Sequence, residues 1–251
     1  MLAPTAALVY RNEDGRRLPV HIWRFPRPAM CVASGPLGGG LAERNWVINA
    51  TVDRAYARLD PDIHLLDMAR DLELAGPGVG MLTAVDVRQA VAAGDGGVHV
   101  VATVGLGHPT WAAAPDGDMR DPYPGTINIV AWVPVRLGPG ALVNGVSTIT
   151  EAKAQALWAY GGEATGTATD ALCVACVGDG RSEEYGGPRS VWGARLARAT
   201  YAAVLQGCRE WGRRHGTGRP VRPESDSLGT TPGSLETRPP AGHPYGDGPV
   251  L

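Results

Sequence analysis

The segment Ala164–Gly178, ATGTATDALCVACVG, joins a polar glycine-containing loop to a short apolar run. Leu172–Val177 is built of small apolar and β-branched residues between turn residues, which predicts a strand. Side chains alternate along a strand, so Cys173 and Cys176 are expected on opposite faces, about 10 Å apart. A disulfide cannot close over that gap. A helix would bring the two sulfurs together, but Gly178 leaves too little length for one. We therefore interpret the C-x-x-C as two core residues.

Apolar periodicity predicts further strands and helices on both sides of this segment. The strands are expected at residues 18–25, 29–34, 45–52, 79–84, 98–106 and 126–135, and the helices at 61–74, 86–93, 141–160 and 190–211. Their interleaving predicts an α/β (α+β) fold, a single-domain layered sandwich of mixed β-sheets flanked by helices. The domain is expected to cover residues 17–215. The proline- and glycine-rich segment 216–251 is predicted to be a disordered tail, because it cannot bury enough apolar surface to offset its ordering entropy.

Composition and charge indicate which partners the 251-residue chain can have. With 23 basic and 25 acidic residues and a net charge of −2, it lacks the excess of basic residues that is typical of proteins that bind nucleic acids or acidic membranes. No stretch approaches the roughly 18 unbroken apolar residues of a membrane span, and no basic region precedes the first apolar run. The four scattered cysteines do not form a secreted disulfide framework. A cytoplasmic protein with a compact, nearly neutral partner is predicted.

The six histidines do not follow the spacing of a zinc site. None stands four residues from another with a glutamate between them, and none stands beside a cysteine pair. No built-in metal is therefore expected. His99 alternates with valines and is interpreted as a core or edge residue of a strand.

The expected helix at residues 141–160 carries a polar cluster in its interior. Asn144, Thr148 and Glu151 fall on the polar side of this helix at 100° per residue. Lys153 instead falls in the apolar stripe, where it must extend to an edge or pair with a buried acid. Asp170, at the start of the following strand, is the expected partner of this lysine.

Two further segments contain polar side chains that could serve either a functional or a purely structural role. In TGTATD, a glycine-flanked hydroxyl pair, Thr167 and Thr169, precedes the carboxylate of Asp170, which suits a nucleophile or an oxyanion-binding loop but equally a local turn. In PGTIN, strand alternation puts Thr126 and Asn128 on the face opposite the apolar residues, where they could hold an amide or meet solvent.

GPLGGG, residues 35–40, lies between two expected strands and lacks the lysine of a phosphate-binding P-loop. It is either a flexible turn or a loop that clasps a substrate through its backbone N–H groups.

Taken together and in this order, these segments are similar to the adenosylcobinamide amidohydrolase family, CbiZ. The resemblance runs from about Cys31 to Cys208, whereas residues 105–123 depart from the family pattern and leave any role of His108 open. The matching segments are GPLGGGLAERNWVIN (35–49), VGMLTAVDV (79–87), PGTINIVAWVPVRL (124–137), ALVNGVSTITEAKAQAL (141–157), TGTATDALCVAC (165–176) and GPRSVWGARLARATYAAV (187–204).

This resemblance implies hydrolysis of the amide between an aminopropanol group and a propionate side chain of the corrin ring. The product would be adenosylcobyric acid, in cobinamide salvage for coenzyme B12 synthesis. No cofactor is expected, since the substrate itself carries the cobalt. The alternatives are a non-catalytic corrinoid-binding protein and a general small-metabolite amidase; the oligomeric state, a homo-oligomer included, stays open. The expected substrate-binding residues are Gly38, Gly39, Asn49, Asp86, Thr126, Asn128, Asn144, Thr148 and Thr169.

The expected catalytic residues are Glu151, Lys153, Thr167 and Asp170, and two routes are open to them. In the first, Thr167 or Thr126 attacks the amide, activated by Lys153 or a carboxylate. In the second, Glu151 and Asp170 direct a water while Asn128 and backbone N–H groups hold the oxyanion. The second route is preferred because it requires fewer specialised features of the sequence.

Overall fold

The computed structural model describes residues 3–115 and 125–216. The helices are α1 (Pro61–Asp71), the 3₁₀ turn η1 (Val87–Gln89), α2 (Pro139–Tyr160) and α3 (Val191–His215). The strands are β1 (Ala7–Glu13), β2 (Arg16–Ala33), β3 (Gly40–Thr51), β4 (Gly78–Thr83), β5 (Val91–Asp95), β6 (Val98–Gly105), β7 (Pro109–Thr110), β8 (Thr126–Val133), β9 (Gly166–Thr167) and β10 (Ala171–Cys176).

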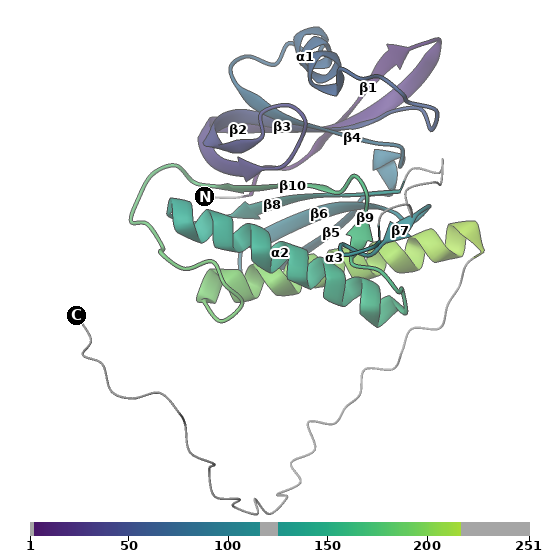
Figure 1. Cartoon of the computed structure of the whole chain (residues 1–251). Helices are drawn as coiled ribbons and strands as arrows, with labels where there is room; N and C mark the ends of the chain where they lie inside the picture. Colours follow the sequence, from purple (N-terminus) through teal and green to yellow (C-terminus); the bar gives the residue numbers. More distant parts are fainter. Residues whose placement is uncertain (1–2, 116–124, 217–251) are drawn as a thin grey trace, which may run out of the picture.

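Most strands form one mixed sheet that folds over on itself. Its order is β4-β3-β2-β10-β8-β6-β5, and β1 pairs with β2 outside this path. Figure 1 shows the resulting layers: α1, then β2 to β4, then β10, β8, β6 and β5, then α2 and α3. β3–β4 and β8–β10 are parallel, and the other pairs of this sheet are antiparallel. The expected layered sandwich of mixed strands flanked by helices is confirmed.

The 18-residue strand β2 belongs to both layers of the sheet. Its first half pairs with β1, its second half pairs with β10, and β3 follows it along both halves. The register against β3 shifts between Arg24 and Ala29, as at a β-bulge. The two strands expected at residues 18–25 and 29–34 are therefore one, and because β1 pairs from Ala7 onward the folded unit starts ahead of the expected residue 17.

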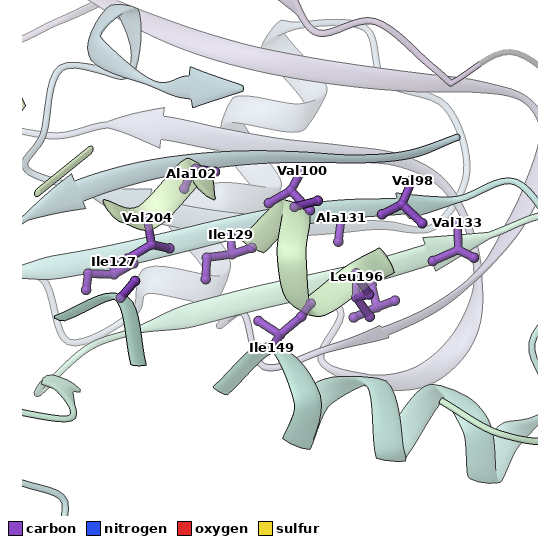
Figure 2. Close-up of a cluster of buried hydrophobic side chains, with 14 of the residues drawn as sticks. Val98, Val100, Ala102, Ile127, Ile129, Ala131, Val133, Ile149, Leu196 and Val204 are labelled. Carbon is purple, nitrogen blue, oxygen red and sulfur yellow. The ribbon is translucent and has the colours of Figure 1, made fainter. Parts of the chain in front are cut away.

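The larger core lies between the sheet and the helix pair α2 and α3. Figure 2 shows alternate side chains of β6 and β8 pointing toward Ile149 of α2 and toward Leu196 and Val204 of α3. On β8, Ile127 and Ile129 lie in this core, as the alternation predicted, so Thr126 and Asn128 face the other way. Cys173 and Cys176 likewise lie in different core clusters and are free thiols, which confirms the interpretation of the C-x-x-C.

The prediction of a helix at residues 86–93 is wrong. Only the turn η1 is helical there, and β5 follows it directly, paired antiparallel with β6 through a turn at Gly96 and Gly97. Both glycines have a positive φ, which suits the tight connection. Pairing with β6 therefore outweighs the helical propensity of the alanines in this segment.

Local signals mark the ends of the two long helices. Pro139 stands in the first turn of α2, where its missing N–H costs nothing, and Gly161 ends the helix in the left-handed region. The hydroxyl of Ser190 accepts the Gly193 N–H at 3.1 Å and caps α3.

Gly207 brings α3 close to the sheet, and this contact supports a stability prediction. A Cβ at this position would lie 2.5 Å from Val104 Cγ2. Gly207→Ala is expected to lower the free energy of unfolding by about 1–3 kcal/mol through overpacking, measured by urea denaturation. Gly140→Ala in α2, where a Cβ meets nothing within 4 Å, is the matched control and is expected to be neutral or stabilising. Equal effects of both substitutions would contradict the close contact.

Candidate active site

A cavity of about 870 Å³ opens where the two layers of the sheet meet the end of α3. Its volume lies toward the upper end of the range for small-molecule sites, about 300–1,000 Å³. Among the expected site residues, Asp86 and Thr126 line it. The described lining residues are Thr51, Arg54, Ala55, Ala84, Val85, Asp86, Gln89, Gly107, Thr126, Trp211, Arg214 and His215.

Thr126, which lines this cavity, belongs to a chain of hydrogen bonds. Its hydroxyl lies 2.8 Å from the hydroxyl of Thr169, which donates to the Gly125 carbonyl at 3.0 Å. Because the single hydroxyl proton of Thr169 is donated to that carbonyl, the Thr126 hydroxyl must be the donor in its bond to Thr169. The lone pairs of the Thr126 oxygen are then available to accept an N–H, such as that of an amide.

Behind Thr126, an amide network joins the two layers of the sheet. Asn128 donates to Asn49 Oδ1 at 2.9 Å and to the Leu82 carbonyl at 2.8 Å, and Asn49 donates to Thr103 Oγ1 at 3.1 Å. Both asparagines are buried, and the Asn128 Oδ1 has no hydrogen-bond partner among the described residues. The expected residues Asn49 and Asn128 are not among the described lining residues, but each lies two positions along its strand from one of them, Thr51 and Thr126.

Asp170 is the centre of a second polar cluster next to this strand. Its carboxylate accepts the Ile127 N–H at 2.9 Å and the Thr167 N–H at 3.1 Å, and also binds the Thr167 hydroxyl and the Lys153 ammonium. The side chains of Lys153 and Asp170 are only 12% and 15% exposed. The expected pairing of Lys153 with Asp170 is therefore confirmed, and the carboxylate ties the loop before β10 to α2 and β8.

Glu151 lies apart from this cluster. It is exposed on α2, and no hydrogen bond or ion pair joins it to Lys153, Thr167 or Asp170 in the described part of the chain. Residues two apart on a helix do not share a face, which is why Lys153 reaches the loop and Glu151 does not.

Four expected substrate-binding residues lie away from the cavity. Thr148 is buried and donates to the Gly186 carbonyl at 2.9 Å, and the exposed Asn144 stands against Gly187. This part of the polar stripe of α2 packs on the loop that contains Gly186 and Gly187. Gly38 has a φ of +68° and packs so tightly on β4 that a Cβ would lie 1.9 Å from the Gly78 carbonyl oxygen. With the neighbouring Gly39, it belongs to a turn folded against β4.

The charged side chains of the cavity wall differ in how they are paired. Asp86 accepts three hydrogen bonds from the Arg88 side chain at 2.5–3.0 Å, and this guanidinium lowers the pKa of the carboxyl. Arg214 pairs with Glu210 at 3.5 Å. Arg54 has no ion-pair partner among the described residues. The wall therefore contains one carboxylate, which is already neutralised, and two guanidinium groups.

The wall segment that contains Thr51 and Arg54 is held in place by β1 and α1. The helix was expected from the sequence, but β1 and these contacts were not. Arg11 donates to the Thr51 carbonyl at 3.0 Å. The Tyr56 hydroxyl lies 3.0 Å from Nδ1 of the buried His64, whose Nε2 lies 3.2 Å from a Glu13 oxygen. Burial lowers the pKa of His64, which favours the neutral imidazole as the form that links Tyr56 to Glu13.

The last turn of α3 supplies three lining residues that sequence reasoning missed: Trp211, Arg214 and His215. The His215 ring stacks on the Trp211 indole, with 3.7 Å between the ring centroids and 20° between the planes. The spacing of four residues, which puts two side chains on one helix face, was the signal available in the sequence.

Among residues 3–115 and 125–216, no three His, Cys, Asp or Glu side chains form a group that could hold a metal ion. In the same ranges, no helix has the length and apolar character to cross a membrane.

Comparisons with known proteins give the family of this chain. It is 35% identical over 194 residues to an adenosylcobinamide amidohydrolase of Halobacterium salinarum, across 71% of this chain and 82% of the relative. It is 28% identical over 180 residues to the enzyme of that name from Methanosarcina mazei, across 68% of this chain and 86% of the relative. A protein structure from Pyrococcus horikoshii OT3 matches 78% of this chain with a TM-score of 0.39 and 12% identity, too little to establish a common fold. Since the family model of adenosylcobinamide amidohydrolase, CbiZ, matches residues 4–216, the chain belongs to that family.

Proposed function

We propose that this chain hydrolyses adenosylcobinamide at the amide between its aminopropanol group and the corrin ring propionate, and releases adenosylcobyric acid. The family and both named relatives support this activity. The observation that supports its location is the cavity in which Thr126 and Asp86, from two separate motifs of the resemblance, line one wall of a space of about 870 Å³.

The wall suits a ligand that carries many amides. The Thr126 oxygen accepts an N–H, and the two guanidinium groups, Arg54 and Arg214, donate to carbonyl oxygens. The side chains of a corrinoid are carboxamides, which supply both kinds of partner. We place the scissile amide beside Thr126, with the amide network of Asn49 and Asn128 holding the strand beneath it.

Hydrolysis at this place adds water to the amide carbonyl, breaks the C–N bond and leaves a carboxylate and a protonated amine. Attack by Thr126 itself lacks a base, because its proton goes to Thr169 and the chain ends on a backbone carbonyl. Asp170 already receives four donors and serves to position Thr167 and the start of β8. A directed water is therefore the proposed nucleophile, and neither Glu151 nor Asp170 directs it.

The test is incubation of the full chain with adenosylcobinamide, with free aminopropanol and adenosylcobyric acid measured by mass spectrometry. Stoichiometric and repeated release of both products supports the proposal. Tight retention of the corrinoid without product would identify a binding protein. Hydrolysis of simple amides at rates that do not depend on the presence of a corrin ring would identify a general amidase.

The proposal includes no cofactor of the protein's own, because the cobalt belongs to the substrate. Dialysis against EDTA, followed by assay in metal-free buffer, is expected to leave kcat and KM within about twofold of the untreated protein. A loss of more than about tenfold that Zn²⁺ or another divalent ion restores would contradict this part of the proposal.

A further inference from the structure

We propose that His215 is the catalytic general base and then the general acid of the hydrolysis, acting from the last turn of α3. This inference rests on the proposed function, since it assigns a role within the same cavity. The expected catalytic set did not contain this residue.

The cavity wall offers four ionisable side chains in the described residues, and three of them are unsuited to accept a proton. Arg54 and Arg214 carry guanidinium groups, which stay protonated in proteins. Asp86 is bound by the Arg88 side chain, which lowers the pKa of the carboxyl and makes it a weak base. His215 is the fourth, and an imidazole is the side chain most often used to move protons at neutral pH.

A hydrogen bond fixes which nitrogen of His215 can accept a proton. Its Nδ1 lies 3.0 Å from the Trp211 carbonyl oxygen, and a carbonyl can only accept. Nδ1 therefore carries the proton of the neutral ring, and the lone pair lies on Nε2. Nε2 has no partner in the part of the chain that the structure describes.

The stack on Trp211 holds the imidazole in place. The two rings lie nearly parallel at 3.7 Å, and the backbone bond to the same residue restricts the ring further. Figure 1 shows the C-terminal end of α3 at the same end of the molecule as β7 and β9, and His215 lines the cavity together with Thr126. The charged groups around it are Arg213, Arg214 and Glu210 on α3, and Arg54 and Asp86 on the cavity wall.

The proposed step balances without a further reactant. Nε2 takes a proton from water while the water oxygen bonds to the amide carbon, which gives a tetrahedral oxyanion. The imidazolium then returns this proton to the amide nitrogen, the C–N bond breaks, and the carbonyl forms again as the carboxylic acid. The acid loses its proton to solvent as the amine takes one up.

The experiment compares His215→Ala with the wild-type chain on adenosylcobinamide, with and without added imidazole. His215→Ala is expected to lower kcat about 100- to 10,000-fold, with KM within about threefold. Free imidazole is expected to restore kcat at least tenfold, because it can occupy the space left beside Trp211. His215→Phe keeps a ring on Trp211 and should show the same loss without rescue by imidazole.

His99→Ala is the matched control, since His99 is exposed on β6 and does not line this cavity. It is expected to keep the wild-type kcat and to be indifferent to imidazole. Wild-type turnover together with an unimpaired His215→Ala would overturn the role of His215 but not the proposed function. An impaired His215→Ala that imidazole does not rescue would do the same. A wild-type chain that releases no aminopropanol would overturn the proposed function, and the inference with it.

Discussion

Asp170→Ala will lower the free energy of unfolding by about 3–5 kcal/mol, the range for removing one member of a buried ion pair. The substitution leaves the nearly buried Lys153 ammonium without its partner. It also removes the acceptor of the Ile127 N–H and of the Thr167 N–H and hydroxyl. Urea denaturation followed by circular dichroism measures the change, and product release is expected to fall with the fraction of folded protein.

Two variants determine whether the loss belongs to this carboxylate. Lys153→Met removes one of four donors and leaves the other three, so its cost is expected to be smaller, about 1–2 kcal/mol. Asp179→Ala removes an exposed aspartate that pairs with Arg27 at 3.4 Å, and is expected to stay within about 0.5 kcal/mol of wild type. Equal costs for Asp170→Ala and Lys153→Met would show that the backbone N–H groups do not depend on the carboxylate.

Thr126→Val is expected to lower kcat/KM about 10- to 100-fold while the protein stays folded. Thr126 lines the cavity, and valine keeps the shape of its side chain but removes the hydroxyl that bonds to Thr169. An amide N–H of the substrate would then lose its acceptor, a cost of about 1.4–2.7 kcal/mol in the transition state. Steady-state kinetics with adenosylcobinamide measures the change.

Thr200→Val is the matched control for Thr126→Val. The Thr200 hydroxyl is buried on α3 and has no hydrogen-bond partner in the described residues, so its removal leaves no group unpaired. This variant is expected to keep wild-type kinetics and to be as stable as the wild type or more so. Comparable losses of kcat/KM in both variants would mean that the hydroxyl of Thr126 has no particular part in the reaction.

Patterns of local spacing predicted much of the fold and part of the site. The alternation in β8 put Thr126 and Asn128 on the face away from the helices, and the apolar stripe of α2 singled out Lys153 as a lysine in need of an acid. These inferences hold because a period of 2 or 3.6 residues fixes which side chains share a face.

Long-range pairing was beyond such patterns. Residues 86–93 look helical until β6 is available to pair with Val91–Asp95. Thr148 looks like a surface residue until the Gly186 carbonyl is placed against it. His215 stood at the border of a segment set aside as a tail. It is the exposed last residue of α3, and its stack on Trp211 and its place in the cavity wall are visible only in the structure.

The course of β2 has a consequence for biosynthesis. The second half of this strand pairs with β10. The partner of Cys31 is Ala175, which is synthesised 144 residues later. A nascent or truncated chain that stops short of β10 exposes the free edge of β2, and free edges invite pairing with other chains. Fragments that end before residue 171 are accordingly expected to aggregate, whereas a chain that includes β10 covers this edge by itself.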